Sequence, residues 1–329
     1  MIDIRRLSFA YPGVGSKVVL DDISIALEPG FVYGLMGQNG VGKSTLFRLL
    51  SGANPPSSGE VRVLGCTPFE RQPFFLQNIC LVPEDIFMPS MSLSSYGEVY
   101  GAFYPKFSMT DLKRYALDFD ISLDKNMAFM SMGQRKKAAI SFALATNARI
   151  LLLDEPTNGM DIPSKRFFRS IIAERQMDDS MIIVSTHQIR DIEPCVTAAI
   201  IVHDRRIILC ETVKNLLAQY RFGRFPEDEP YIYAERVSRT EREGITRRKA
   251  GDTSQGEIDL ELLFEAAVAG VFDENGQPVR QWKRNECDSN SADTFEQKSM
   301  RDENYQRKVE NRAFNAETSD DDFDAKRGR

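Results

Sequence analysis

A glycine-rich run from residue 37 to residue 45 combines residue types that can hold phosphate groups. It fits the spacing GxxxxGK[ST], with the residues Gly37, Gln38, Asn39, Gly40, Val41, Gly42, Lys43, Ser44 and Thr45. Glycines let backbone N–H groups turn towards phosphate oxygens, and the N-terminus of a following helix adds a favourable dipole. In such a loop Lys43 can reach the β- and γ-phosphates, and the Ser44 hydroxyl can ligate Mg²⁺. The loop by itself predicts nucleotide binding and no particular reaction.

Two adjacent carboxylates follow an apolar run much later in the chain. Asp154 and Glu155 come directly after Ile150–Leu153, and ligands bind at the carboxyl ends of buried parallel strands. We expect Asp154 to support Mg²⁺, directly or through water, and Glu155 to align and polarise a water that attacks the γ-phosphate. A lone acidic pair often only begins a loop, but the phosphate loop in the same chain favours the catalytic interpretation.

A histidine stands at the end of another predicted strand. His187 follows the run Met181–Ser185, and the other of the 2 histidines, His203, begins an ordinary turn. A histidine in such a place can hydrogen-bond a γ-phosphate and help to hold Glu155 and the attacking water. Taken alone, His187 has a structural role as its more common alternative.

Short β-rich apolar runs alternate with amphipathic segments through residues 1–220. The predicted strands are Phe31–Met36, Glu60–Leu64, Ile79–Val82, Ile150–Leu153, Met181–Ser185 and Ala198–Val202. This alternation is typical of the α/β class, in which helices cover a largely parallel sheet. One helix should begin near Lys43 and end near Gly52, before Pro55 and Pro56.

The character of the sequence changes from about Arg221. Residues 221–275 are predicted to form a small C-terminal extension, polar at first and then containing one amphipathic helix at Ile258–Val271. This helix either packs on the main domain, which is the more common case, or binds a partner. Residues 276–329 are rich in charges of both signs and poor in apolar side chains, so they bury too little surface to offset the entropy of ordering. We expect this tail to be disordered.

Composition narrows the classes of function. The chain has 329 residues, 42% of them hydrophobic, and a net charge of −6, which gives no global attraction to nucleic acid. The 5 cysteines lack paired spacing, which predicts reduced core thiols rather than zinc sites or disulfides. No apolar run approaches the roughly 20 residues of a membrane-spanning helix, and the N-terminus lacks the apolar block of a secretion signal. We expect a cytoplasmic protein unless a partner holds it at a membrane.

Two further motifs lie on either side of the acidic pair. Residues 131–134, which include Ser131, Gly133 and Gln134, precede Asp154 at the distance of the LSGGQ signature of the ATP-binding cassette (ABC) ATPases. The segment after Glu155 is similar to the one that ends in this family's D-loop, at Asp161. With the phosphate loop, these motifs resemble the ABC ATPase family over roughly residues 1–220.

Tyr11 and His187 extend the resemblance. Tyr11 stands where the family has an aromatic ring that stacks on adenine, with a core-filling strand residue as the alternative. His187 matches the family's switch histidine. The resemblance implies a P-loop NTPase fold with a mostly parallel central sheet, a small antiparallel β subdomain and a helical subdomain at about residues 88–140. The aromatic side chains in that helical region would meet a membrane subunit.

The sequence departs from the family's pattern at two motifs. Met132 replaces the first glycine of the signature and Met130 its leading leucine. In the family the signature serine and second glycine cap the γ-phosphate that the opposite subunit binds, and both remain here as Ser131 and Gly133. Glu84 stands where the family commonly has a Q-loop glutamine, and a carboxylate there could ligate Mg²⁺ more strongly than an amide. Similar variants occur in branches resembling ABC-2-type and YtrB-like exporters.

The resemblance implies an ATPase that binds ATP and Mg²⁺. Two copies, or this chain and a paralogous ATPase subunit, would close on ATP and drive a separate transmembrane permease from the inner face of the cell membrane, with export favoured. One rival is a soluble ABC ATPase that acts on nucleic acid or ribosomes, but such relatives usually carry two cassettes or a long coiled coil. The other is a nucleotide-gated interaction module without hydrolysis, against which Glu155 and His187 argue.

Overall fold

The computed structural model describes residues 1–13, 17–175, 180–236, 241–249, 252, 256–273 and 275–278. Almost all of the tail predicted to be disordered, from residue 279 onwards, therefore lies outside the described residues, as does Cys287. The other four cysteines carry free thiols, as their spacing predicts, and are Cys66, Cys80, Cys195 and Cys210. None of the helices in the described ranges combines the length and the apolar character that a bilayer crossing requires.

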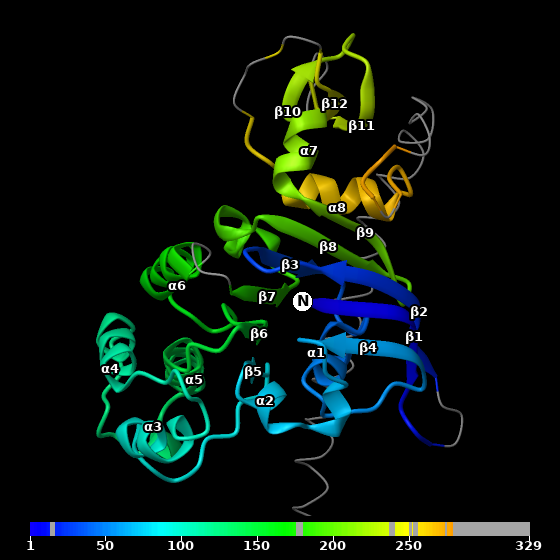
Figure 1. Ribbon diagram of the computed structural model, residues 1–329. Coiled ribbons are helices and arrows are strands. Elements are labelled where there is room, and N and C mark those ends of the chain that lie inside the picture. The colour runs from blue at the N-terminus through cyan, green and yellow to red at the C-terminus, as the bar shows by residue number, and fades with distance from the viewer. Residues whose placement is uncertain are drawn as a thin grey trace, which may run out of the picture. The chain divides into compact units, whose positions relative to one another are not determined.

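A six-stranded sheet forms the centre of the fold, in the order β5-β6-β7-β3-β8-β9 (Figure 1). Its strands are β3 Val32–Met36, β5 Ile79–Val82, β6 Ile150–Asp154, β7 Met181–Thr186, β8 Ala198–His203 and β9 Arg206–Thr212. Neighbours from β5 to β8 pair in parallel, and only β9 at the edge is antiparallel to β8. Every residue of β3, β6 and β7 is buried, as expected for central strands of a parallel sheet. The predicted mostly parallel central sheet is confirmed.

A second, antiparallel sheet has the order β2-β1-β4. Its strands are β1 Ile2–Ala10, β2 Val18–Leu27 and β4 Ser58–Val63. Helix α1, Lys43–Leu50, contacts both β4 and β6 and so joins this sheet to the central one. The shared core contains Leu7, Phe47 and Leu152, which are at most 1% exposed, and burying such side chains contributes about 1.5–3 kcal/mol each. This sheet is the predicted small antiparallel subdomain.

Short helices lie beyond the β5 edge of the central sheet and along one side of it (Figure 1). The α-helices are α2 Pro73–Leu76, α3 Leu93–Gly101, α4 Met109–Asp118, α5 Met132–Ala145 and α6 Ile162–Arg175. Single 3₁₀ turns are η1 Pro68–Glu70, η2 Met127–Phe129, η3 Ile189–Asp191 and η4 Glu193–Cys195. Serine N-caps begin α3, α4 and α5, where Ser92, Ser108 and Ser131 accept hydrogen bonds from backbone N–H groups. Helices α3, α4 and the first part of α5 fall within residues 88–140, where the resemblance implies a helical subdomain, and α4 packs on α5.

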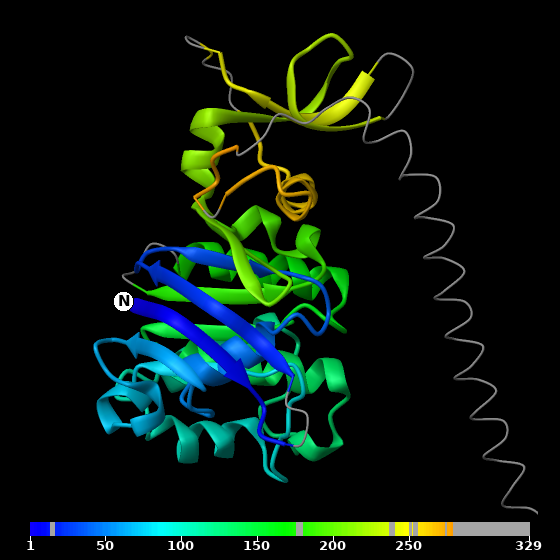
Figure 2. The ribbon, with the colours of Figure 1, turned by 90° about the vertical axis from the view of Figure 1, so that its right-hand side faces the viewer.

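The chain after the central sheet forms a third, antiparallel sheet in the order β10-β12-β11 (Figure 2). The strands of this sheet are β10 Tyr220–Pro226, β11 Tyr231–Arg236 and β12 Glu241–Arg247. Helix α7, Val213–Gln219, precedes them in the chain, and α8, Leu260–Val268, follows them. Helix α8 lies within the stretch predicted to be helical, begins at the N-cap Asp259 and contacts β8, β9 and β12. Its buried residues Leu260 and Leu263 support the interpretation that it packs on the main domain.

Candidate functional site

The glycine-rich loop connects β3 to α1. Gly37 follows the last residue of β3, and α1 begins at Lys43 with Gly42 as its N-cap. Gly40 and Gly42 have φ angles of 77° and 113°, a region that side chains other than glycine rarely adopt. A Cβ atom at Gly42 would also lie 2.7 Å from Leu20 Cδ2. The loop therefore requires glycine at this position both for its backbone angle and for lack of space.

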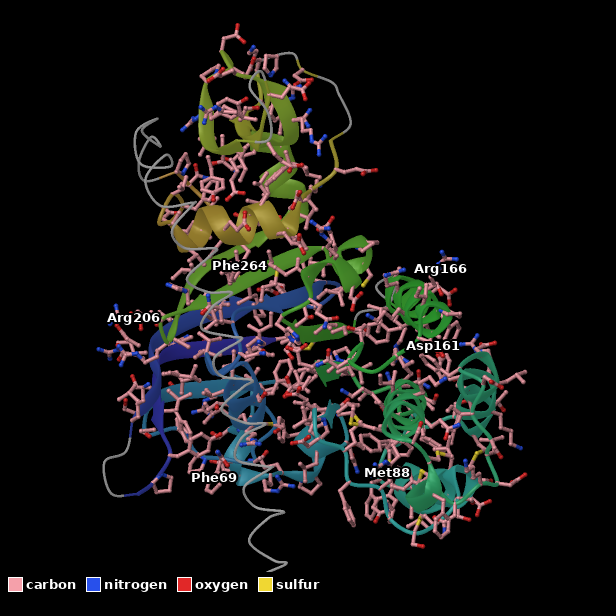
Figure 3. The ribbon with its side chains drawn as sticks, turned by 180° about the vertical axis from the view of Figure 1, so that it is seen from behind. Phe69, Met88, Asp161, Arg166, Arg206 and Phe264 are labelled. Atoms are coloured by element: carbon pink, nitrogen blue, oxygen red, sulfur yellow. The ribbon has the colours of Figure 1, made fainter. Side chains whose placement is uncertain are left out.

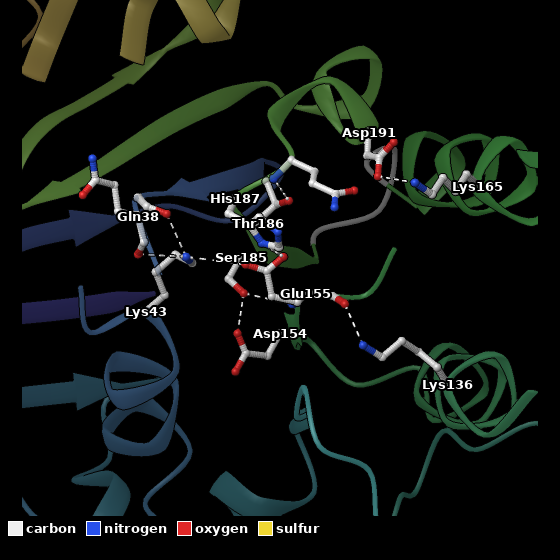
Figure 4. A network of polar contacts seen from close by, with 12 residues as sticks. Gln38, Lys43, Lys136, Asp154, Glu155, Lys165, Ser185, Thr186, His187 and Asp191 are labelled. Carbon is white, nitrogen blue, oxygen red and sulfur yellow. Dashed lines mark hydrogen bonds and ion pairs between the residues drawn. The ribbon is translucent and has the colours of Figure 1, made fainter. Parts of the chain in front are cut away.

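Lys43 is a buried cation within this loop. Its side chain is 6% exposed, and Nζ donates to Gly37 O at 2.8 Å and to Gln38 O at 3.3 Å. Nζ also lies 3.5 Å from Glu155 Oε1 (Figure 4). The phosphate loop and the acidic pair therefore converge, although they lie far apart in the sequence. Of the remaining loop residues, Gln38, Asn39 and Gly40 are exposed, Val41 and Ser44 are half-buried, and Thr45 is buried.

Asp154 and Glu155 occupy the carboxyl end of β6, where Ser185 of β7 holds both. Ser185 Oγ donates to Asp154 Oδ1 and accepts a hydrogen bond from Glu155 N at 3.0 Å. Glu155 N also contacts Ser185 O at 3.2 Å. Glu155 has a φ angle of 45°, a left-handed conformation that costs a non-glycine residue about 1–2 kcal/mol. These contacts fix a strained backbone at the predicted catalytic residue.

The Glu155 carboxylate is 4% exposed and lies between two nitrogen groups. Oε2 is 2.9 Å from His187 Nδ1, and Oε1 faces Lys43. Neither carboxylate oxygen accepts a hydrogen bond within the described residues, and the same holds for the nearby buried hydroxyl of Thr157. Buried polar atoms are normally satisfied, so the Glu155 oxygens indicate a place for a further hydrogen-bond donor such as a water.

Lys136 approaches Glu155 from the opposite side to Lys43 (Figure 4). It lies on α5, is 2% exposed, and its Nζ donates to Glu155 O at 2.8 Å. Burial lowers the pKa of the Lys136 ammonium, and the negative charge of Glu84 is the strongest influence opposing this shift. Sequence reasoning missed both Lys136 and Ser185. Lys136 stands in a run of three basic residues, which is typical of a solvated helix face.

Tyr11 lies beside the first turn of α1. Its hydroxyl is 3.1 Å from Thr45 Oγ1 and accepts a hydrogen bond from Arg48 Nη1 at 2.9 Å. The ring packs edge-on against Phe9, yet the residue is 37% exposed. Tyr11 is therefore not the core-filling residue that its alternative interpretation requires, and more than a third of its surface is accessible to solvent.

The signature residues form the start of α5. Ser131 and Gln134 make reciprocal hydrogen bonds in a capping box, which fixes the N-terminus of the helix. A Cβ atom at Gly133 would lie 2.7 Å from Gly159 O, so the signature and the segment before Asp161 are in close contact. Met132 is 65% exposed. Ser131 is also exposed, so this face of the motif is open to a second molecule.

Asp161 immediately precedes α6, which begins at Ile162, and is labelled in Figure 3. Its Oδ1 accepts a hydrogen bond from Ser164 N at 2.8 Å, and hydrogen bonding first to the Ser164 side chain and then to its backbone lowers the pKa of the Asp161 carboxyl. Lys137 Nζ lies 3.9 Å from Asp161 Oδ2. The carboxylate therefore caps its own helix, while its side chain remains 62% exposed.

Glu84 follows β5 and is exposed. It lines a cavity of about 360 Å³ together with Asp85, Phe87, Met132 and Lys136. Within the described ranges, no three His, Cys, Asp or Glu side chains gather at a distance suited to one metal ion. The role of Glu84 as a Mg²⁺ ligand stays a prediction.

The oxygen donors at the loop suit a hard cation. The Ser44 hydroxyl follows Lys43 at the start of α1, and Asp154 keeps its Oδ2 free of the Ser185 contact. A hydroxyl and a carboxylate are the ligands that Mg²⁺ prefers, and it usually completes its shell with phosphate oxygens and waters. The residues present therefore fit Mg²⁺ that arrives with a nucleotide.

Comparison with known proteins gives a consistent family. Residues 20–158 match the family model described as ABC transporter. A lipid A-core flippase of Pseudomonas fluorescens, described as ATP-dependent, is 32% identical over 66% of this chain and 38% of its own length. The ABC transporter ATP-binding protein YtrB of Bacillus subtilis is 29% identical over 59% of this chain and 65% of its own length. The arabinose import ATP-binding protein AraG of Yersinia pestis is 30% identical over 62% of this chain and 40% of its own length. The chain spans less than two thirds of each of these relatives.

Solved structures agree on the fold. One, described as the ATP binding subunit of an ABC transporter, superposes with a TM-score of 0.59 at 21% identity, over 66% of this chain and 92% of that one. At this identity the likeness shows the P-loop NTPase fold, with its mixed sheet, small antiparallel sheet and helices. The chain is therefore similar to the ATP-binding proteins of the ABC transporter family, with the match to the family model at residues 20–158.

Proposed function

We propose that this chain is the ATP-binding and ATP-hydrolysing subunit of an ABC transporter, and that it drives a separate membrane-spanning subunit. The observation that carries this proposal is the position of Glu155. Its buried carboxylate lies 3.5 Å from Lys43 of the phosphate loop and 2.9 Å from His187, and no hydrogen bond to either oxygen is made by the part of the chain that the structure describes. A carboxylate in this position can accept a proton from water beside a bound γ-phosphate.

Each residue of the site has a distinct task in hydrolysis. The loop N–H groups and Lys43 bind the phosphates of ATP, and Tyr11 offers its ring to the adenine. Glu155 orients the attacking water, and His187, which lies beside the carboxylate, donates to the γ-phosphate. Bound Mg²⁺ supplies charge neutralisation at the β- and γ-phosphates. Ser44 and Asp154 are the residues of this chain that would hold it.

A second ATP-binding subunit completes the site in this proposal. Ser131 and Gly133 lie at the exposed start of α5, beyond Lys136, rather than at the phosphate loop of their own chain. In a head-to-tail pair they would cap the γ-phosphate bound by the opposite subunit. Met132 would then add a bulky apolar side chain at the contact between the subunits, because it is 65% exposed. ATP would close the pair, and hydrolysis would open it.

A membrane partner is supported by a large apolar hollow in the helical region. A cavity of about 610 Å³ lies between the α2–β5 segment and α3, and its lining includes Leu76, Tyr96, Tyr100, Phe103 and Phe142. Phe103 is 66% exposed, and exposed apolar surface of this kind marks a docking site. We propose that the partner inserts a helix here and that the chain acts at the inner face of the membrane. Export is the direction that the Glu84 variant favours.

The test is ATP hydrolysis by the purified chain in the presence of Mg²⁺. Glu155→Gln should retain ATP binding, lose turnover and accumulate as an ATP-bound dimer, while Lys43→Ala should lose binding or hydrolysis. Glu98→Gln on α3 serves as a control because Glu98 is exposed. Turnover by Glu155→Gln equal to that of the parent would defeat the catalytic assignment. Recovery of the chain with ribosomes rather than with a membrane protein would favour the soluble rival.

A further inference from the structure

We infer that Lys136 is a positioning residue for Glu155, which it holds by the main chain from the helix that carries the signature motif. This inference rests on the proposed function, because it concerns how the catalytic carboxylate of the proposed ATPase is placed. Lys136 does not touch the reacting atoms. It acts through the Glu155 carbonyl, to which its Nζ donates at 2.8 Å.

Lys136 is held in the interior at an electrostatic cost. The residue is 2% exposed, and desolvation of the ammonium is the largest influence on its pKa. A buried cation is expensive unless it is paired and hydrogen-bonded. A side chain that served only to fill space at this position would not require a charge. The charge is used to donate to a carbonyl beside four carboxylates, those of Glu84, Glu155, Asp154 and Asp85.

Lys136 binds the carbonyl of Glu155, a residue of the site with a strained backbone. Glu155 has a φ angle of 45°, so its peptide groups are in a conformation that would relax if they were released. Its N–H donates to Ser185 on β7, and its C=O accepts from Lys136 on α5. The residue is thus held on both sides of its Cα atom. The direction of the carboxylate towards His187 and Lys43 follows from this hold.

The same helix would also face the other subunit. Lys136 lies a little more than one turn after the N-cap Ser131, and the capping box makes this first turn rigid. In the proposed pair, Ser131 and Gly133 contact the nucleotide of the opposite subunit. A displacement of α5 on closure would therefore reach the Glu155 main chain of its own subunit through Lys136. This gives the two ATP sites a physical connection inside one chain.

The experiment compares Lys136→Met and Lys136→Arg in the full chain. Methionine keeps the length of the side chain without an N–H group, whereas arginine keeps a charged donor. Lys113→Met is the matched control, since Lys113 is an exposed lysine on α4. For each protein, kcat and KM for ATP, the Kd for a non-hydrolysable ATP analogue and the Tm are measured. Lys136→Met should lower kcat by about 100-fold, as misplacement of a catalytic group by about 1 Å does.

KM and Kd should stay within about twofold of the parent, because the phosphate loop is untouched. The Tm should fall, because the variant removes a cation from beside buried carboxylates, but the loss of kcat should persist at temperatures at which the variant is fully folded. Lys136→Arg should recover part of kcat. A kcat of Lys136→Met within about threefold of the parent would overturn the inference, and so would a loss of kcat that tracks Kd or that disappears where the variant is fully folded. If Lys136→Met does not fold, Lys136→Leu, which also lacks an N–H group, replaces it under the same criteria.

The result separates this inference from the proposed function. A parent chain that neither binds nor hydrolyses ATP contradicts the proposed function, and the inference falls with it. A parent that hydrolyses ATP with a Glu155-dependent turnover supports the function whatever Lys136→Met shows. In that case an unchanged Lys136→Met removes only the positioning role.

Discussion

The Tyr11 hydroxyl lies 3.1 Å from the Thr45 hydroxyl, so the aromatic ring beside the phosphate loop is tied to the last residue of that loop. Arg48 Nη1 donates to the same phenol oxygen at 2.9 Å. With Arg48 as donor, the Tyr11 O–H group is free to donate to Thr45 Oγ1, and the Thr45 proton is then free to point at a ligand. Hydrogen bonds thus connect Tyr11, whose ring would stack on adenine, to Thr45, whose hydroxyl would contact a phosphate.

Tyr11→Phe should weaken ATP binding while keeping the ring. One lost hydrogen bond of about 0.5–1.5 kcal/mol corresponds to a rise in Kd of about 2- to 10-fold. Tyr11→Ala should weaken binding further, because it also removes the stacking surface. Isothermal titration with an ATP analogue measures both, and Tyr100→Phe in the helical region is the control. Equal affinities for Tyr11→Phe and the parent would show that the tie to Thr45 does not matter.

Ser185→Ala should lower both stability and turnover. The serine is fully buried, and its hydroxyl joins Asp154 Oδ1 to Glu155 N. Removal of such a partner costs about 1–3 kcal/mol in the free energy of unfolding. Chemical denaturation checks the stability, and a phosphate-release assay checks the turnover. Ser170→Ala, at an exposed serine of α6, should change neither. Parent-like values in Ser185→Ala would remove Ser185 from the site.

Glu84→Gln should raise the Mg²⁺ concentration needed for half-maximal hydrolysis. Glu84 is exposed and lines the cavity next to Lys136, so its charge acts on the site through partly solvated surroundings. A charge in such a setting contributes about 0.2–1 kcal/mol, which corresponds to a shift of about 1.4- to 5-fold. A Mg²⁺ titration at fixed ATP measures it, with Glu70→Gln as the control. Superimposable titrations of parent and variant would exclude Glu84 from metal binding.

The C-terminal region should lose stability as the pH rises through the weakly acidic range. Desolvation and the Glu235 carboxylate raise the pKa of Glu265 on α8 from 4.5 to about 7. Between these values the folded chain binds more protons than the unfolded one, so the free energy of unfolding falls with rising pH. Glu265→Gln, neutral throughout, should flatten this part of the profile of Tm against pH. Glu174→Gln on α6 is the control, and a profile unchanged in Glu265→Gln would contradict the assignment.

The sequence predicts the parts of the site that follow strands. Each of the five runs predicted as strands of the central sheet matches a strand of the structure to within one residue at either end. The ends of parallel strands meet at one edge of a sheet, so the convergence of Lys43 and Glu155 follows from the pattern alone. Apolar periodicity and glycine spacing are local signals, and they were sufficient here.

The contacts of Lys136 and Ser185 depend instead on how elements pack. Lys136 is buried only because α5 lies against the end of β6, and no local pattern distinguishes it from Lys137 beside it. The strands β10 to β12 were also not predicted, because charged residues interrupt their alternation. Arg242 is buried on β12 and pairs with Glu227 at 3.4 Å, a burial that depends on its partner strand.

Because Ser185 and Lys136 bind the peptide N–H and C=O groups of Glu155, its side chain can be exchanged without loss of these hydrogen bonds. A single codon change at this position would then silence the chemistry and leave the architecture whole. Gene duplication followed by such a change would yield a paralogous subunit that binds nucleotide but does not hydrolyse it. The main-chain hydrogen bonds of Glu155 thus allow asymmetric pairs to evolve in which only one subunit hydrolyses nucleotide.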